Sequence, residues 1–255
     1  MSIALDLITR WDAQQTGYIR HRAERFATIA RVVSSINEGV AAPRILDLAG
    51  GPGSLARAVL AEIPGATAVV ADKDPLLVAI AADLAETDPR LQTAHVDLDD
   101  PEWAQHPLIA QAPFDAVVSS TALHWLKPDK LVAVYWKLAE IIRPGGIFLN
   151  GDNLYYDERT EPTLHALAKA DDEQFQAQTF TNGVDTWEQW WAAAEAVPHY
   201  AEAVRLRAAT WGEELHVAPP KVSLGFHLET LRSAGFAETG TVWRYLDDHV
   251  VYGLH

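Results

Sequence analysis

The chain has 255 residues, of which 49% are hydrophobic, so it can form one large domain or one domain with a sizeable insertion. Its formal net charge of −15 opposes binding to nucleic-acid phosphates and to anionic membrane surfaces. It contains no cysteine, which excludes disulfide bonds and thiolate metal sites. We find neither a signal peptide nor an apolar run that could span a bilayer, so we expect a soluble, cytoplasmic protein.

The first part of the chain predicts N-terminal helical structure followed by a strand and a glycine-rich turn. A helix or turn is expected over about 4–12, and a helix over 18–36, where apolar residues recur at helical spacing. The apolar run 44–48 predicts a buried strand. After the glycines, Ser54 is expected to cap a helix over 55–62.

Strands and helices then alternate up to residue 152. We expect strands over 67–71, 91–96, 114–119 and 147–150, and helices over 76–84 and 128–142. Asp74 and Pro75 are typical of an N-cap followed by proline in the first turn. The Arg-Pro-Gly-Gly segment 143–146 should end the second of these helices. This alternation predicts an α/β fold with a doubly wound, mostly parallel sheet.

The pattern changes after Asp152. Residues 153–222 predict a helical insertion, with helices near 161–175, 187–196 and 199–208 and a capping box formed by Thr186 and Gln189. The tryptophans at 187, 190, 191 and 211 are expected chiefly to pack the insertion, although an apolar or cation-binding acceptor site is the alternative.

The end of the chain predicts a return to the core. The Ala-Pro-Pro segment 218–220 leads into a helix over 223–234 that Gly235 closes. Segments 238–245 and 249–254 predict a hairpin joined at Asp247-Asp248. We therefore divide the chain into a core, residues 1–152 with 223–255, and a substrate-capping insertion, residues 153–222.

Polar residues follow four successive predicted strands. Asp47 and the loop 49–53 follow the first, Asp72 the second, Asp97 the third and the segment Ser119-Ser120-Thr121 the fourth. The carboxyl ends of parallel strands border the ligand crevice, so we expect these groups to meet in one pocket. Asp47, just before the glycines, would repel a pyrophosphate and attract a ligand with a cationic amino acid end, such as S-adenosylmethionine (SAM).

Five segments resemble, in order, the motifs of the class I SAM-dependent methyltransferases. They are Asp47–Gly53, Ala71–Pro75, Val96–Asp99, Phe114–Trp125 and Leu138–Phe148. The resemblance covers roughly residues 40–152 and 223–255. It implies a Rossmann-like, seven-stranded sheet with an antiparallel last strand, N-terminal helices that act as a lid, and SAM as cofactor. Family members usually have glycine where Ala49 stands, and we interpret the alanine as a tolerated variant.

The same resemblance implies roles for residues at the strand ends. Asp72 would accept hydrogen bonds from both ribose hydroxyls. Asp97 would accept one from the adenine amino group, with the Leu98 backbone N–H facing a ring nitrogen. Asp47 would orient the loop and the ligand's ammonium. The remaining expected cofactor contacts on the strand ends are Ala49, Gly51, Gly53, Lys73 and Ser119. Structural turns or solvated acids are the alternatives for these residues.

The N-terminal helix adds Tyr18 and Arg22. Tyr18 is expected to pack on or hydrogen-bond the carboxylate end of SAM, and Arg22 to pair with that carboxylate. Packing on the helix surface is an equally good interpretation of both residues.

His124, just after the fourth strand, is the candidate catalytic residue. It is placed to act as general base for an acceptor hydroxyl or amine, although a structural histidine or a pocket wall is the alternative. Trp125, which is also assigned to the substrate site, fits the core better than a ligand stack. Asp152 and Asn153 end the fifth strand and are expected to touch the acceptor.

These observations predict SAM-dependent methyl transfer to a small-molecule acceptor. The ten histidines show no metal-ligand spacing, and no Gly-x-Ser-x-Gly motif of serine hydrolases is present. One alternative is a SAM-binding protein of the same fold that catalyses another reaction or regulates. A NAD-dependent dehydrogenase is opposed by the acid before the glycines, the missing third glycine and the terminal hairpin. The acceptor, the methylated atom and the oligomeric state do not follow from the sequence.

Overall fold

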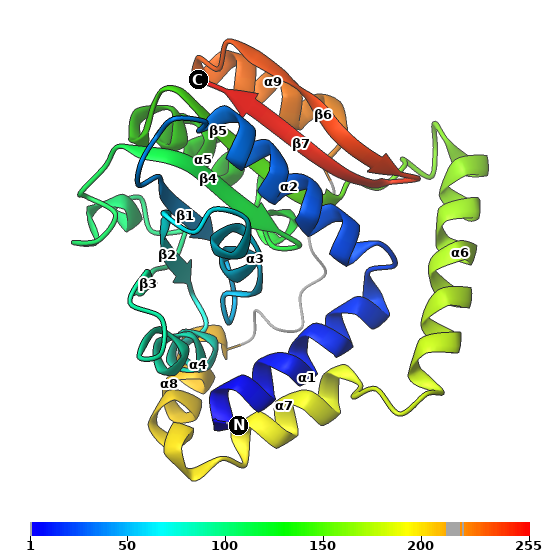
Figure 1. The fold of residues 1–255 in the computed structure, drawn as a ribbon. Coiled ribbons are helices and arrows are strands. Elements are labelled where there is room, and N and C mark those ends of the chain that lie inside the picture. Colours follow the sequence, from blue (N-terminus) through cyan, green and yellow to red (C-terminus); the bar gives the residue numbers. More distant parts are fainter. Residues whose placement is uncertain (1, 213–219, 221) are drawn as a thin grey trace.

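The computed structural model describes residues 2–212, 220 and 222–255, and a seven-stranded sheet with the order β3-β2-β1-β4-β5-β7-β6 lies at its centre (Figure 1). The strands are β1 (Arg44–Leu48), β2 (Thr67–Asp72), β3 (Leu91–His95), β4 (Phe114–Ser120), β5 (Ile142–Asn153), β6 (Glu238–Tyr245) and β7 (Asp248–Leu254). The first five strands run parallel, and β7 pairs antiparallel with both β5 and β6. The predicted doubly wound sheet with an antiparallel last strand is confirmed.

Helices cover both faces of this sheet. They are α1 (Ile3–Tyr18), α2 (Arg22–Ile36), α3 (Ser54–Glu62), α4 (Pro75–Ala85), α5 (Pro128–Ile141), α6 (Pro162–Phe180), α7 (Trp187–Glu195), α8 (Ala201–Trp211) and α9 (Leu224–Ala234), with short 3-10 helices η1 (Trp103–Gln105), η2 (Leu123–Trp125) and η3 (Pro198–Tyr200). Successive strand residues point to opposite faces, so Ile45 packs in the core with α2, α3 and α4, and Leu46 packs in the core with α5 and α9. Both faces are apolar, as a parallel sheet requires.

The N-terminal helices differ from the prediction. The helix expected over 18–36 begins only at Arg22, and the first helix continues to Tyr18. Ile19 adopts an extended conformation, with φ −119° and ψ 98°, which ends the first helix. Tyr18 and Arg22 therefore lie on two helices rather than one.

The turn from β1 into α3 corrects a second expectation. Gly53, with φ 88°, occupies the N-cap position, and Ser54 is the first helical residue and makes no capping hydrogen bond. The predicted cap at Ser54 is wrong because the chain enters this helix through a left-handed residue, a conformation that favours glycine.

Other turns follow the sequence closely. Asp74 caps α4 by accepting hydrogen bonds from two backbone N–H groups, Thr186 forms the capping box of α7, and Gly235 closes α9 with φ 109°. The helix α5 ends before Arg143, but strand β5 begins at Ile142 instead of residue 147. The terminal hairpin turns one residue earlier than expected, at Leu246-Asp247.

Helices α6, α7 and α8 follow β5, and α1 lies beside α7 (Figure 1). The rings of Trp11 on α1 and Trp190 on α7 meet edge to face, with centroids 4.6 Å apart. Trp187, Trp190 and Trp191 therefore pack against Trp11 of α1 as well as against one another. Of the expected return at 218–220, only Pro220 lies within the described residues. The division into a core and an insertion stays a prediction.

Within the described ranges, no helix is long and apolar enough to cross a membrane.

Candidate functional site

A buried carboxylate supports the glycine loop that follows β1. Asp47 is 0% exposed, and its Oδ2 accepts a hydrogen bond of 2.8 Å from the Ala56 N–H. A Cβ at Gly50 would lie 2.6 Å from Asp47 Cγ, so the loop can rest on the carboxylate only because residue 50 is glycine. Asp47 Oδ1 has no hydrogen-bond partner. Burial raises the pKa of Asp47 to about 7.

Asp72 supports the same loop from the end of β2. Its Oδ2 accepts a hydrogen bond of 2.7 Å from the Gly51 N–H, and its Oδ1 accepts one of 2.8 Å from the Asp74 N–H. Burial raises the pKa of Asp72 to about 6. Each carboxylate oxygen offers two lone pairs, so both oxygens of Asp72 retain capacity for a further donor.

Three residues of the loop have positive φ: Ala49 at 52°, Gly51 at 56° and Gly53 at 88°. Glycine adopts this conformation freely, whereas alanine is disfavoured in it because of its Cβ. The position at which the sequence departs from the methyltransferase pattern is therefore a strained one.

Lys73 and Asp97, both predicted cofactor contacts, are brought together beside Asp72. Lys73 Nζ lies 3.1 Å from Asp97 Oδ2, and Asp97 Oδ1 accepts a hydrogen bond of 2.9 Å from the Asp99 N–H. Leu98 is half-buried next to them. Part of the hydrogen-bonding capacity of Asp97 is thus used within the protein, and its contact with adenine stays a prediction.

Helix α8 reaches this part of the site, which the sequence analysis missed. Asp74 Oδ2 accepts hydrogen bonds from Arg207 Nε (2.8 Å) and Trp211 Nε1 (2.7 Å). Lys73 Nζ lies 4.9 Å from the ring centroid of Trp211. The sequence pattern favours Trp211 as part of the packing of the insertion, and no spacing in the sequence connects it to Asp74.

The N-terminal helices lie over the glycine loop. A Cβ at Gly51 would be 3.9 Å from the Trp11 ring. Arg22 is buried, pairs with Asp12 at 2.9 Å, and its charge favours the ionised form of Asp47. Tyr18 packs on Phe180 of α6, with ring centroids 4.7 Å apart. Arg22 is thus near enough to Asp47 for its charge to act there, and Tyr18 contacts the helical segment. Their contacts with SAM stay predictions.

His124 and Asp152, both predicted substrate-site residues, form a hydrogen-bonded pair. His124 Nδ1 lies 2.7 Å from Asp152 Oδ1, and the His124 backbone N–H donates to Asp152 Oδ2 at 3.2 Å. Burial alone would lower the pKa of His124, but the charge and hydrogen bond of Asp152 raise it. Burial opposes ionisation of Asp152, yet His124 and Arg25 lower its pKa. The ionised Asp152 therefore accepts a hydrogen bond from His124 Nδ1–H, which leaves Nε2 of the neutral ring as the basic atom.

Trp125 corrects the sequence-based interpretation. It was expected to suit the core, but its side chain is 53% exposed, and its ring centroid lies 5.3 Å from that of His124. It occupies the last position of the short helix η2, where Leu123 takes the buried position.

A group of fully buried polar residues lies at the ends of β4 and β5. Ser119 is opposite Asn150, both are 0% exposed, and neither the Ser119 hydroxyl nor the Asn150 amide has a hydrogen-bond partner. Asn150 and Arg25 were missed by the sequence analysis. Arg25 had a usable signal, since it shares the helix face of Phe26 and Ile29, which predicts burial.

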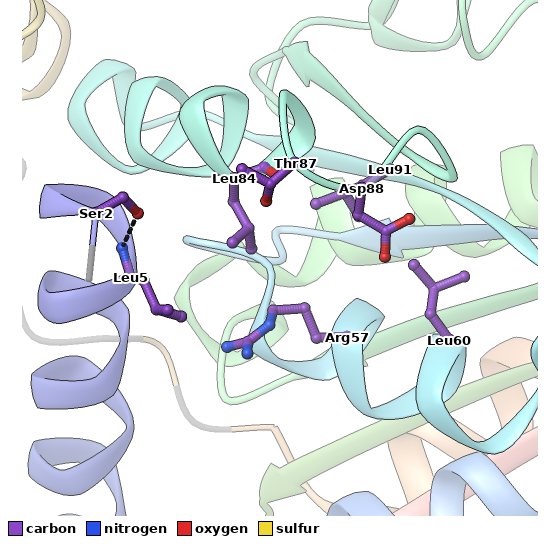
Figure 2. A pocket seen from close by; sticks show the side chains of 8 residues that line it. All are labelled: Ser2, Leu5, Arg57, Leu60, Leu84, Thr87, Asp88 and Leu91. Atoms are coloured by element: carbon purple, nitrogen blue, oxygen red, sulfur yellow. Dashed lines mark hydrogen bonds between the residues drawn. The ribbon is translucent and has the colours of Figure 1, made fainter.

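A cavity lies away from these residues. It has a volume of about 490 Å³ and is lined by Leu60, Leu84 and Leu91, with Arg57 beside them (Figure 2). Leu91 is the first residue of β3, so this cavity is at the opposite end of that strand from Asp97. Within the described ranges, which exclude His216, no group of three or more His, Asp or Glu side chains could hold a metal.

Comparisons with known proteins connect this site to one family. The family model described as a methyltransferase domain matches residues 46–148, a segment that contains Asp47, Asp72, Asp97 and His124. No curated protein matches the sequence. The chain resembles a solved O-methyltransferase family protein from Burkholderia thailandensis with 18% identity and a TM-score of 0.57, covering 89% of this chain and 55% of that chain.

Two further solved structures are similar in fold. An O-methyltransferase family 2 protein from Planctomyces limnophilus, in complex with apigenin, has 19% identity and a TM-score of 0.53, covering 84% of this chain and 51% of that chain. Human N-acetylserotonin methyltransferase, in complex with SAM, has 17% identity and a TM-score of 0.53, covering 94% of this chain and 58% of that chain. The chain thus spans about half the length of these structures, and at these identities the likeness is one of fold.

Proposed function

We propose that this chain, whose residues 46–148 form a methyltransferase domain of the class I SAM-dependent family, transfers a methyl group from SAM to a small-molecule acceptor. The observation that carries the proposal is the support of one glycine loop by two buried acids at neighbouring strand ends, Asp47 and Asp72. Such a loop offers backbone groups to a ligand, and its acids suit a cationic ligand better than a phosphate.

The residues present fit SAM. Asp47 Oδ1 is buried and accepts no hydrogen bond, and the ammonium group of SAM would be a suitable donor for it. Asp72 keeps lone pairs on both oxygens for the two ribose hydroxyls. Arg22, whose charge acts on Asp47, would pair with the ligand's carboxylate.

SAM, when bound, supplies an activated methyl group on its sulfonium. The protein has to align the acceptor with that methyl group and to exclude water. His124 Nε2 would accept the proton of the acceptor's hydroxyl or amine as the new bond to carbon forms. Asp152 holds Nδ1 and stabilises the resulting imidazolium, so proton transfer leaves a charge pair rather than an isolated charge.

The charge of the chain and the related structures support a small-molecule acceptor. The net charge of −15 disfavours nucleic acid as acceptor. The complex of the Planctomyces protein with apigenin favours a small aromatic hydroxyl compound as the first acceptor to try. The cytoplasm stays the expected location.

The test combines calorimetry with an activity assay. SAM should bind to the wild-type protein, and NADH should not. Methyl-labelled SAM, offered with a panel of small phenols and amines, should yield a labelled product. A matched Asp88→Asn variant, altered beside the distant cavity, should bind SAM far better than Asp72→Asn. Absence of SAM binding would overturn the proposal; SAM binding without a labelled product from any acceptor would favour another reaction or a regulatory role.

A further inference from the structure

Arg25 is an almost completely buried arginine beside the His124–Asp152 pair. It lies on α2 and is 1% exposed. Its Nη1 donates to Asp248 Oδ1 at 2.7 Å, and its Nη2 donates to the hydroxyls of Ser120, at 2.8 Å, and Thr121. One guanidinium thus connects α2 to the start of β7 and to the end of β4.

The turn that Arg25 holds is strained. Thr121 has φ 56°, a conformation that a β-branched residue rarely adopts. Its N–H donates to the Gly151 carbonyl at 2.8 Å. A Cβ at Gly151 would lie 2.9 Å from Arg25 Cδ and Nε, so glycine is required there for the arginine to reach the turn. Strain of this kind persists only where the surroundings impose it.

The strained turn leads directly to His124. Only Ala122 separates Thr121 from the short helix η2, which contains His124. Asp152 follows Gly151 on β5 and holds both the ring and the backbone N–H of His124. Arg25 packs against Gly151, whereas Asp152 binds His124. Successive strand residues face opposite sides of the sheet, so Arg25 holds the turn from one side and Asp152 holds the histidine from the other.

We propose that Arg25 is a positioning residue for His124: it holds the strained Ser120-Thr121 turn, and through it places the imidazole against Asp152 with Nε2 towards the acceptor. The inference rests on the proposed function, in which His124 is the base. Within the described residues, Arg25 makes no hydrogen bond to His124. In this proposal it does not touch the acceptor.

Arg25 acts on His124 in two ways, through its charge and through the turn that it holds. Asp152 on β5 raises the pKa of His124, and Arg25 on α2 lowers it. Asp248 on β7 neutralises Arg25 at 2.7 Å. A variant that loses Arg25 alone leaves the largely buried Asp248 carboxylate without its partner. Arg25→Met with Asp248→Asn removes both members of the ion pair, and with them the anchoring of the turn, without leaving an unpaired charge.

The decisive measurement is nitrogen NMR of the histidine rings in the cofactor-free protein. At a pH where the ring is neutral, His124 of the wild type should carry its proton on Nδ1. In the Arg25→Met/Asp248→Asn variant, we expect the two tautomers to become mixed. Thr121→Val removes the hydroxyl that Arg25 binds but keeps the side-chain shape, and it should shift the tautomers the same way, whereas Thr121→Ser should not. Arg20→Met, which breaks the pair of Arg20 with Asp171, is the matched control for loss of an arginine.

Activity gives a second measurement. With an acceptor found in the panel, the double variant should lose about 10- to 100-fold in kcat, while its calorimetric Kd for SAM changes less than about twofold. Wild-type tautomer populations in both the double variant and Thr121→Val would overturn the proposal. If the double variant does not fold, the comparison of Thr121→Val with Thr121→Ser decides alone. If no acceptor is methylated, the proposed function fails, yet the NMR result still tests whether Arg25 positions His124.

Discussion

The buried carboxyl of Asp47 predicts that SAM binding is coupled to proton release. An unfolded aspartate ionises near pH 3.9, and burial raises the pKa of Asp47 to about 7 in the folded protein. The folded state therefore binds the proton more tightly, and the cofactor-free protein loses stability as pH rises from about 4 to about 7. A cationic ammonium beside the unpartnered Oδ1 favours the ionised form, so it should reverse this trend.

The size of the effect follows from the ionised fraction. With a pKa of about 7, Asp47 is about one-tenth ionised at pH 6, half ionised at pH 7 and nine-tenths ionised at pH 8. If only the ionised form binds, affinity should be about tenfold weaker at pH 6 than at pH 8, and binding at pH 7 should release about half a proton. Asp72, with a pKa of about 6, adds a smaller effect in the same direction.

Calorimetry in buffers of different ionisation enthalpy measures the released protons directly. Asp47→Asn should abolish most of the pH dependence between pH 6 and pH 8, because asparagine does not titrate and can still accept the bond from the Ala56 N–H. Asp88→Asn, far from the loop, serves as a control and should titrate like the wild type. Binding at pH 7 without proton release, or an unchanged pH dependence in Asp47→Asn, would refute the reasoning.

Three further predictions concern single residues. Asp72→Ala should weaken SAM binding by at least about tenfold and leave the circular dichroism spectrum unchanged, because it removes two acceptors for the ribose; unchanged calorimetric affinity would contradict that role. His124→Ala should lower kcat far more than SAM affinity, and an equal loss in both would indicate a structural histidine. Ala49→Gly should raise the free energy of unfolding by about 1 kcal/mol in urea denaturation, because it relieves a positive φ, and destabilisation would show that the alanine methyl packs usefully.

Local signals predicted much of the fold. The apolar run 44–48, the Asp74-Pro75 cap and Gly235 each determine backbone conformation through their own chemistry, and each occurs as expected. Asp47 and Asp72 meet at one loop because the carboxyl ends of parallel strands lie at the same edge of the sheet. These features need only neighbouring residues and the direction of the strands.

What could not be predicted depends on contacts between distant segments. The bond from Trp211 to Asp74 joins residues 137 positions apart, and the bond from Arg25 to Asp248 joins residues 223 positions apart. Trp125 looked like a core residue because it is large and aromatic, but the single turn of η2 directs Leu123 inwards instead. Periodicity cannot decide which side of so short a helix is buried.

The unfavourable features of the chain collect around the same strand ends. Ala49 and Thr121 have positive φ after β1 and β4, while Asp47, Arg25 and Asp152 place charged groups at 0–1% exposure. Strained backbone and buried charge each reduce stability, and proteins tend to retain them where function requires them. The apolar interior formed by the remaining strand residues provides the stability that makes these features tolerable. Their clustering at the carboxyl edge of β1, β4 and β5 is therefore an argument, independent of any sequence motif, that the reactive centre of this protein lies there.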